Sequence, residues 1–314
     1  MMVLEIASGD KNLRILILGP SGQIGYELST KATQIADVIT AGRSAADIIF
    51  NPLDYLALAN IFASVQPDIV INAIAYTAVD KAESDQEQAF LLNSSLPETL
   101  AKLCEKHNCL LIHYSTDFVF DGSLVRPWIE TDITNPLSIY GRSKLEGENA
   151  IKLSSCKSVI LRTSWVYGER GSNFLLTMLR LGRERDSLSV VNDQIGSPSY
   201  SGDIALATLQ LCLKYREDPD LNTELAGIFH LTSSGETSWY GFAKTIFELA
   251  SEFESFTLNQ ILPISTAEYP TPARRPAYSV LNCTKLKTVF DIEMSSWKES
   301  LQQCIRTYYH SRAG

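Results

Sequence analysis

The sequence has no long apolar run, and its amino terminus lacks the pattern of a secretory signal. No apolar stretch approaches the roughly 18 residues that a membrane-spanning helix needs. The first residues are only mildly apolar and include Glu5, Asp10 and Lys11, which is not the order of charged, apolar and small residues that marks a signal peptide. We therefore expect a protein with no membrane partner.

Clusters of metal-ligating residues are also lacking. The six cysteines and four histidines are scattered along the chain, and no two cysteines form a C-x-x-C pair. This spacing argues against a structural zinc site and predicts free, buried thiols in a reducing compartment. We expect a cytoplasmic location and no required metal.

Positive charge is in deficit. There are 27 lysines and arginines against 36 aspartates and glutamates, which gives a net charge of −9. A chain of this sign is a poor partner for the phosphate backbone of a nucleic acid, so we expect no nucleic-acid partner. A small anionic ligand would need local basic residues. The 314 residues exceed what one ordinary core needs, which predicts one large domain or two closely joined ones.

What the sequence does contain is a series of short apolar runs separated by helical patterns. Such runs are typical of strands buried on both faces of a parallel sheet. Strands alternating with helices predict right-handed βαβ units and an α/β fold with a doubly wound parallel sheet, of the Rossmann type. The expected strands cover residues 13–18, 38–41, 48–51, 67–73, 110–115 and 158–163, and the expected helices include 54–65 and 86–107.

The last part of the chain is less regular. Short strands are expected at 188–191, 227–231 and 260–264, and helices at 201–216, 238–252 and 296–310. We predict a dinucleotide-binding domain over residues 1–165, with 201–222 returning to it. Residues 166–314 are predicted to form mainly a smaller mixed α/β substrate-binding lobe that covers the sheet edge.

A glycine turn follows the first expected strand directly. The turn reads Gly19-Pro20-Ser21-Gly22-Gln23-Ile24-Gly25 and runs into a helix start. Strand, glycine turn and helix form the setting in which backbone N–H groups bind a pyrophosphate. The spacing is G-x-x-G-x-x-G rather than G-x-G-x-x-G. The alternative is a tight connection without a ligand, and the context favours nucleotide binding over it.

The end of the second expected strand bears on the choice of cofactor. An acidic residue there would bind the ribose hydroxyls of NAD, but the chain reads Gly42-Arg43-Ser44. Arginine and a hydroxyl suit a 2′-phosphate, which favours NADPH; the alternative is a surface arginine on a loop. Asn51 and Pro52 follow the third strand and would flank the adenine.

Tyr140 and Lys144 lie one helical turn apart on an expected helix, so their side chains share a face. An ammonium beside a tyrosine stabilises the phenolate and lowers its pKa, which lets the tyrosine exchange a proton with a carbonyl oxygen. Gly141 and Gly147 on this helix predict that something packs closely against it. The alternative is a chance pair on an exposed helix.

The strand that precedes this helix ends in Ser115-Thr116-Asp117. A hydroxyl at that point can hydrogen-bond a substrate carbonyl, although serine, threonine and aspartate also form ordinary turns. Three other residues have competing interpretations. Trp165 is a core residue or a ligand platform. Arg274 and Arg275 are loop residues or charge partners for the diphosphate of a nucleotide sugar, and we select Arg275 as the candidate.

Together, Gly19-x-x-Gly22-x-x-Gly25, Ser115-Thr116-Asp117 and Tyr140-x-x-x-Lys144 resemble the extended short-chain dehydrogenase/reductase superfamily. Longer segments are similar to the dTDP-4-dehydrorhamnose reductase family, and the similarity covers nearly the whole chain after residue 13. These segments are residues 72–83, 113–122, 162–167, 192–198 and 269–276.

This resemblance implies reduction of the C4 ketone of dTDP-4-dehydro-L-rhamnose to dTDP-L-rhamnose with a nicotinamide cofactor. It implies Tyr140 as the proton donor, Lys144 as its tuner and ribose anchor, and Thr116 as the hydroxyl partner. On the substrate side it implies Thr116, Asp117 and Trp165. The expected cofactor-binding residues are Gly19, Gly22, Gln23, Ile24, Gly25, Arg43, Ser44, Asn51, Pro52, Ala75, Tyr76, Thr77, Tyr114, Tyr140 and Lys144.

Family members often carry aspartate where this chain has Gly42-Arg43 and Asn51. That departure favours NADPH over NADH, although NADH stays open. Two other functions also stay open. One is reduction of another 4-keto deoxysugar nucleotide. The other is a catalytically silent regulatory subunit of the same fold, such as that of methionine adenosyltransferase. We expect a small-molecule nucleotide-sugar substrate and a homodimer.

Overall fold

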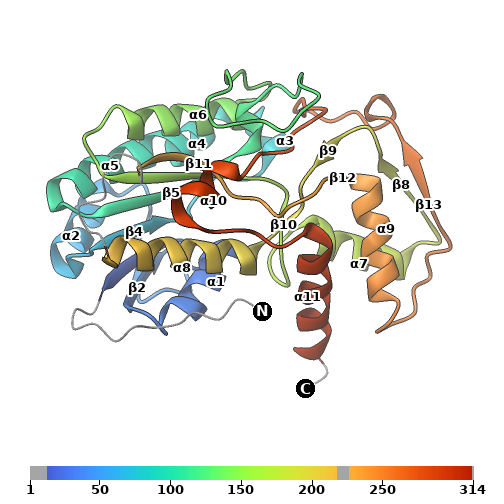
Figure 1. The fold of residues 1–314 in the computed structure, drawn as a ribbon, viewed down its shortest axis with the longest axis horizontal. Helices are drawn as coiled ribbons and strands as arrows, with labels where there is room; N and C mark the ends of the chain where they lie inside the picture. The colour runs from blue at the N-terminus through green and yellow to red at the C-terminus, as the bar shows by residue number, and fades with distance from the viewer. Residues whose placement is uncertain (1–12, 218–225, 313–314) are drawn as a thin grey trace.

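A seven-stranded sheet organises the computed structural model, which describes residues 13–217 and 226–312 (Figure 1). Every strand pair in this sheet is parallel. The strands lie in the order β11-β6-β5-β4-β1-β2-β3. They are β1 (Arg14–Leu18), β2 (Asp37–Gly42), β3 (Ile48–Ile49), β4 (Ile69–Asn72), β5 (Leu110–Thr116), β6 (Ser158–Thr163) and β11 (Gly227–His230).

The strand order confirms the predicted doubly wound fold. The chain moves outward from β1 through β2 to β3 and then returns to place β4 on the other side of β1. The order therefore reverses between β1 and β4. In open sheets of this kind, ligands bind at the carboxyl ends of the strands beside this reversal.

Helices cover both faces of the sheet, as Figure 1 shows. Because side chains alternate along a strand, Ile15 and Ile17 of β1 pack in one core cluster with α1 (Gln23–Ala32) and α8 (Ser201–Glu217). Leu16 and Leu18 pack in the other cluster, with helices from the opposite face. Those helices are α2 (Tyr55–Val65), α5 (Leu96–His107) and α6 (Ile139–Lys152).

The single helix expected over 86–107 is interrupted. The structure has α4 (Gln86–Phe90), a π-helical turn η1 (Leu91–Ser95) and α5, and the short α3 (Val79–Ala82) precedes them. A π turn widens the helix by one residue and is frequent at functional sites. Here it turns the buried Asn93 toward the loop after β4. Hydrophobic periodicity alone does not reveal such a turn.

The carboxyl-terminal part of the chain divides its elements between the large sheet and a second core. The strand expected at 227–231 is β11, which extends the large sheet beside β6, and Phe229 of β11 packs on Phe290 of α10 (Thr284–Phe290). A separate cluster joins α7 (Phe174–Glu184), α9 (Trp239–Ala250) and α11 (Trp297–His310) to β8 (Ser187–Val191).

Short strand pairs complete this part. β8 pairs in parallel with β13 (Gln260–Ile264), and a 3₁₀ turn, η3 (Thr266–Glu268), follows β13. The other pairs are β7 (Val166–Tyr167) with β10 (Ser199–Tyr200) and β9 (Ile195–Gly196) with β12 (Thr237–Ser238). The boundary between the two predicted domains stays a prediction.

The structure bears on membrane-spanning helices and on the state of the cysteines. Within residues 13–217 and 226–312, no helix has both the length and the apolar character to cross a membrane. The six cysteines are all free, and five are buried while Cys283 is partly exposed.

Helix α6 packs unusually close to its neighbours. A Cβ on Gly141 would lie 2.3 Å from the carbonyl oxygen of Phe118, and a Cβ on Gly147 would lie 2.1 Å from that of Asn93. Real Cβ atoms do not approach backbone oxygens this closely. The close packing predicted at both glycines is confirmed, and it brings α6 against both the end of β5 and the π turn.

We predict that Gly147→Ala destabilises the protein by about 1–3 kcal/mol, because the added methyl must displace backbone rather than a flexible side chain. Chemical denaturation measures the change. Glu146→Ala, on an exposed position of the same helix, should leave the free energy of unfolding nearly unchanged. Equal stability of Gly147→Ala and the wild-type protein would contradict the close contact.

Candidate active site

Most of the predicted site residues lie at the carboxyl ends of β1, β2, β4 and β5, beside the reversal in strand order. The glycine turn follows β1, and Arg43 follows β2. Tyr76 lies in the loop after β4, and Thr116 ends β5. Helix α6 lies against the end of β5 and contributes Tyr140 and Lys144. Segments far apart in the sequence therefore meet at one edge of the sheet.

The glycine turn is shaped for a bound diphosphate. Gly19 has a φ of +85° and donates its N–H to the carbonyl of Ala41 at 2.9 Å. A Cβ on Gly25 would lie 2.0 Å from the oxygen of Gly19, so only glycine allows this turn. Gly22 is the N-cap of α1, offers no side-chain cap, and no acidic residue follows in the first turn. The N–H groups of that turn therefore suit an anion.

The side chain of Gln23 is engaged elsewhere. Its Oε1 accepts a hydrogen bond from Nδ2 of Asn173 at 2.9 Å, and Asn173 is also the N-cap of α7. The turn is thereby tied to the carboxyl-terminal part of the chain. Gln23 and Ile24 can still contribute backbone N–H groups to a ligand.

The residues expected near the adenosine lie around the ends of β2 and β3. Arg43 and Ser44 are exposed, directly after Gly42, whose Cβ would touch Pro20 of the glycine turn at 3.1 Å. Arg43 therefore emerges beside the turn. Asn51 accepts a hydrogen bond from the N–H of Leu53 at 3.1 Å, and Pro52 is buried behind it.

The loop from Ala75 to Thr77 is held by a residue that sequence reasoning missed. Oδ1 of Asn93 accepts from the N–H of Tyr76 at 2.8 Å, and Nδ2 of Asn93 donates to the carbonyl of Tyr76 at 3.1 Å and to Oγ of Ser143 at 3.0 Å. Asn93 thus joins this loop to α6. The only signal in the sequence was an asparagine inside an expected helix.

Lys144 is buried, with 2% of its surface exposed. Its Nζ donates to the carbonyl oxygen of Tyr114 at 2.5 Å and lies 3.4 Å from Nε2 of His113. The phenol of Tyr114 points into the core, where it shares a hydrogen bond of 2.7 Å with Thr208 of α8. The cofactor contact expected for Tyr114 stays a prediction, whereas its carbonyl holds Lys144 in place.

The electrostatics of Tyr140 differ from the expectation. Burial raises the pKa of Tyr140 to about 12, and the nearby Asp117 adds to this effect, while a hydrogen bond with Thr116 opposes it. The prediction that Lys144 lowers this pKa was wrong for the structure, because desolvation of the phenolate dominates. Burial also lowers the pKa of Lys144 to about 8, against the opposing charge of Glu148.

Asp117 is buried at the start of a 3₁₀ turn, η2 (Asp117–Val119), that follows β5. Its Oδ1 accepts a hydrogen bond from Thr116 at 3.0 Å, while Oδ2 has no partner among the described residues. Burial raises the pKa of Asp117 to about 6, although the nearby hydroxyls of Ser279 and Thr116 partly offset this shift. An unpartnered oxygen beside Tyr140 suits a ligand hydroxyl.

Trp165 has a backbone φ of +46°, in the left-handed region that residues other than glycine rarely adopt. Its indole stacks on Trp239 at 3.5 Å and 6°, and a Cβ on Gly196 would lie 2.5 Å from the ring. Nε1 of Trp239 donates to Gln194 at 3.2 Å. The two indoles lie one behind the other as a parallel stack, and Trp239 was not anticipated from the sequence.

Arg275 is already paired. Its Nη2 lies 2.7 Å from Oδ2 of Asp80, and its Nη1 donates to Oγ1 of Thr271 at 2.5 Å. Asp80 belongs to α3, so this ion pair joins the proline-rich loop to the first part of the chain. Binding a diphosphate would require Arg275 to exchange partners, and that role stays a prediction.

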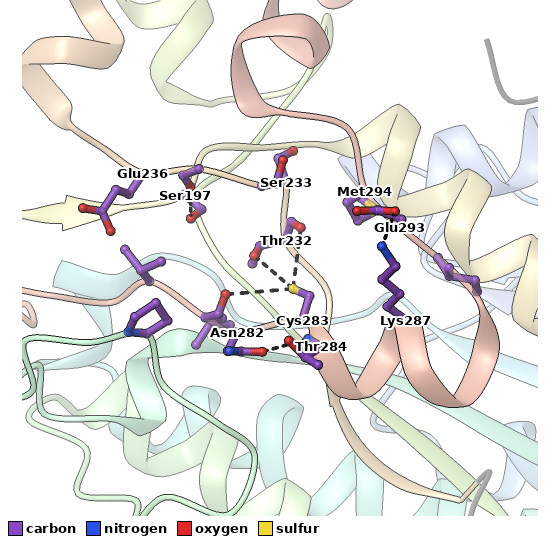
Figure 2. A pocket seen from close by; sticks show the side chains of 16 residues that line it. Ser197, Thr232, Ser233, Glu236, Asn282, Cys283, Thr284, Lys287, Glu293 and Met294 are labelled. Carbon is purple, nitrogen blue, oxygen red and sulfur yellow. Dashed lines mark hydrogen bonds and ion pairs between the residues drawn. The ribbon is translucent and has the colours of Figure 1, made fainter.

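A cavity of about 350 Å³ lies apart from these residues, between the loop after β11 and the start of α10 (Figure 2). Cys283 lines it, with Sγ 3.4 Å from Oγ1 of Thr232, and burial raises the pKa of this thiol. Lys287 and Glu293 pair across its rim at 2.7 Å. None of the predicted site residues is among those that line this cavity.

The raised pKa of Asp117 predicts a pH-dependent stability. Its ordinary value is 3.8 and its folded value is about 6, so between these values the folded state binds more protons than the unfolded chain. The free energy of unfolding therefore falls as pH rises through this window. Above it, the buried carboxylate costs about 3 kcal/mol, which Asp117→Asn removes. Chemical denaturation at about pH 4 and about pH 8 should show that the free energy of unfolding of Asp117→Asn increases relative to that of wild type as pH rises.

Asp121→Asn is the matched control. Hydrogen bonds from Ser123 and Asn135 lower the pKa of Asp121 below its ordinary 3.8, so the stability that its carboxylate contributes is lost only as pH falls below about 4. The difference between its replacement and wild type should therefore stay nearly constant between about pH 4 and about pH 8. An Asp117→Asn difference that is the same at both pH values would contradict the raised pKa.

Comparison with known proteins identifies the family. A family model described as RmlD substrate binding domain matches residues 13–310. The dTDP-4-dehydrorhamnose reductase of Sinorhizobium fredii (strain NBRC 101917 / NGR234) is 41% identical over 293 residues, covering 93% of this chain and 97% of that protein. The dTDP-4-dehydrorhamnose reductase of Escherichia coli (strain K12) is 39% identical over 302 residues, covering 96% and 100%.

A solved structure agrees. The crystal structure of dTDP-4-dehydrorhamnose reductase from Bacillus anthracis in complex with NADP has a TM-score of 0.85 and 33% identity to this chain, and the match covers 95% of this chain and 100% of that one. The chain therefore belongs to the dTDP-4-dehydrorhamnose reductase family.

Proposed function

We propose that this protein reduces the C4 ketone of dTDP-4-dehydro-L-rhamnose to dTDP-L-rhamnose with NADPH, a step in nucleotide-sugar biosynthesis. Full-length relatives at about 40% identity carry the name of this reductase, and a structural neighbour was crystallised with NADP. The observation that supports the proposal is that α6, which carries Tyr140 and Lys144, lies against the end of β5: the phenol of Tyr140 lies near Thr116, and Lys144 donates to the carbonyl of Tyr114.

The protein's own groups supply the proton and the geometry, while a bound nicotinamide supplies the hydride. Tyr140 donates its phenolic proton to the C4 oxygen as that oxygen gains negative charge. Thr116 donates a hydrogen bond to the same oxygen and stabilises the charge. Lys144 anchors the ribose and returns a proton to Tyr140. The products are a secondary alcohol and an oxidised cofactor.

The remaining residues divide between the two ligands. Gly22, Gln23 and Ile24 bind the cofactor pyrophosphate through the N-terminus of α1, and Arg43 with Ser44 receives the 2′-phosphate. On the substrate side, the free oxygen of Asp117 accepts from a sugar hydroxyl. The flat face of Trp165, backed by Trp239, packs on the sugar.

The cellular setting is part of the proposal. We assign the protein a cytoplasmic location, which the free cysteines support, and a homodimeric state. Its partner molecule is a small nucleotide sugar and not a nucleic acid, whose phosphate backbone is a poor partner for a chain of net charge −9.

Tyr140→Phe removes the proton donor and leaves the ring. We expect kcat to fall by about 100- to 10,000-fold with dTDP-4-dehydro-L-rhamnose and NADPH, while the NADPH dissociation constant stays near the wild-type value. NADPH absorbance gives the rate, NMR identifies the product, and fluorescence titration gives the binding. Tyr269→Phe, at an exposed tyrosine, is the control. Full turnover by Tyr140→Phe would overturn the assignment.

Arg43→Ala tests cofactor choice. Charge-assisted bonds to a 2′-phosphate contribute about 1.5–3 kcal/mol, so the ratio of kcat/KM for NADPH to that for NADH should fall by roughly 10- to 100-fold. Arg142→Ala removes an exposed arginine from α6 and should leave the ratio unchanged. An unchanged ratio in Arg43→Ala would make Arg43 an ordinary loop residue.

A further inference from the structure

The buried His113 lies behind Lys144 and has a defined orientation. Asn72, at the end of β4, accepts the N–H of Ile74 at its Oδ1, with a distance of 3.1 Å. This contact fixes the amide, because the opposite orientation would set two donors against each other. Nδ2 of Asn72 therefore faces Nδ1 of His113, 3.0 Å away.

This contact determines the tautomer of His113. Since the amide of Asn72 can only donate, Nδ1 of His113 must accept, and the proton of the neutral imidazole lies on Nε2. Burial and the charge of Lys144 hold the pKa of His113 well below its ordinary value, so the ring is neutral. The resulting Nε2–H points toward Nζ of Lys144, 3.4 Å away.

An N–H facing an ammonium is a donor facing a donor. The only acceptor that holds Nζ is the carbonyl of Tyr114, within the described residues. The amine form of Lys144, in contrast, can accept from Nε2–H. The pair of Asn72 and His113 therefore disfavours the protonated state of Lys144.

The other charged and titratable groups around Lys144 do not cancel this effect. Glu148 lies one turn further along α6, but Nε and Nη2 of Arg162 bind it at 2.8 and 2.7 Å, and Ser115 donates to it at 2.6 Å. The positive charge of Arg162, from β6, offsets much of its negative charge. Asp117 acts on Tyr140, where it adds to the raised pKa of the phenol.

We propose that His113, oriented by Asn72, is a positioning residue that presents an N–H to Lys144 and makes its ammonium a readier proton donor to Tyr140. The proposal rests on the proposed reductase function. After Tyr140 gives its proton to the ketone oxygen, the tyrosinate takes a proton from the Lys144 ammonium. The neutral amine, stabilised by Nε2–H, then takes a proton from solvent, which restores the starting state.

The test is the pH dependence of kcat/KM in wild type and His113→Gln. The glutamine places Oε1 near the position of Nε2, where it accepts from the ammonium. We expect the alkaline limb of the profile to move up by about one pH unit and kcat at neutral pH to fall several-fold. A purely structural role would lower the rate at every pH without moving the limb, and that outcome would overturn the proposal.

Asn72→Asp is a second, independent variant. Its carboxylate accepts from Nδ1–H of His113, which shifts the ring proton and leaves Nε2 as an acceptor for Lys144. The limb should move in the same direction as in His113→Gln. His310→Gln, at an exposed histidine near the carboxyl terminus, is the control and should leave the profile unchanged.

A titration separates this proposal from the proposed function. NMR of protein labelled at the lysine ε-carbons reports the protonation of Lys144 without any turnover, and Lys144→Met assigns the signal. A higher Lys144 pKa in His113→Gln than in wild type supports the proposal even if the keto sugar proves to be the wrong substrate. Equal values would overturn it even if the wild-type enzyme is active.

Discussion

A buried cation constrains the architecture of this site. Lys144 is 2% exposed, and an ammonium removed from water is costly unless its surroundings are fixed around it. The carbonyl of Tyr114 holds Nζ at 2.5 Å, and this requires α6 to lie directly against the end of β5. Gly141 and Gly147 permit that approach, because any side chain there would overlap the backbone of Phe118 or Asn93.

The close approach of α6 also explains the π turn in the preceding helical stretch. The wider turn places Asn93 where its side-chain amide hydrogen-bonds both the backbone of Tyr76, in the loop after β4, and the hydroxyl of Ser143 on α6. One buried amide thus sets the distance between the cofactor loop and the helix that carries Tyr140. A regular helix over the same residues would point Asn93 elsewhere.

The chemistry of the site follows from opposing pKa shifts in a small volume. Burial raises the pKa of Tyr140 to about 12 and of Asp117 to about 6, while it lowers that of Lys144 to about 8. Each shift disfavours a charge that the closed site cannot solvate. Tyr140 therefore keeps its proton until a developing oxyanion draws it, and Lys144 gives its proton readily.

The sequence by itself determined the alternation of strands and helices, the doubly wound sheet and the segments that reach its carboxyl edge, because hydrophobic period and glycine turns are local properties. Through their spacing it also predicted that Tyr140 and Lys144 share a helix. Tertiary structure alone decided the partners of these residues. It set the tautomer of His113, the stack of Trp165 on Trp239 and the pairing of Arg275 with Asp80. It also reversed the expected shift at Tyr140, because burial and contacts between distant segments depend on how the elements pack.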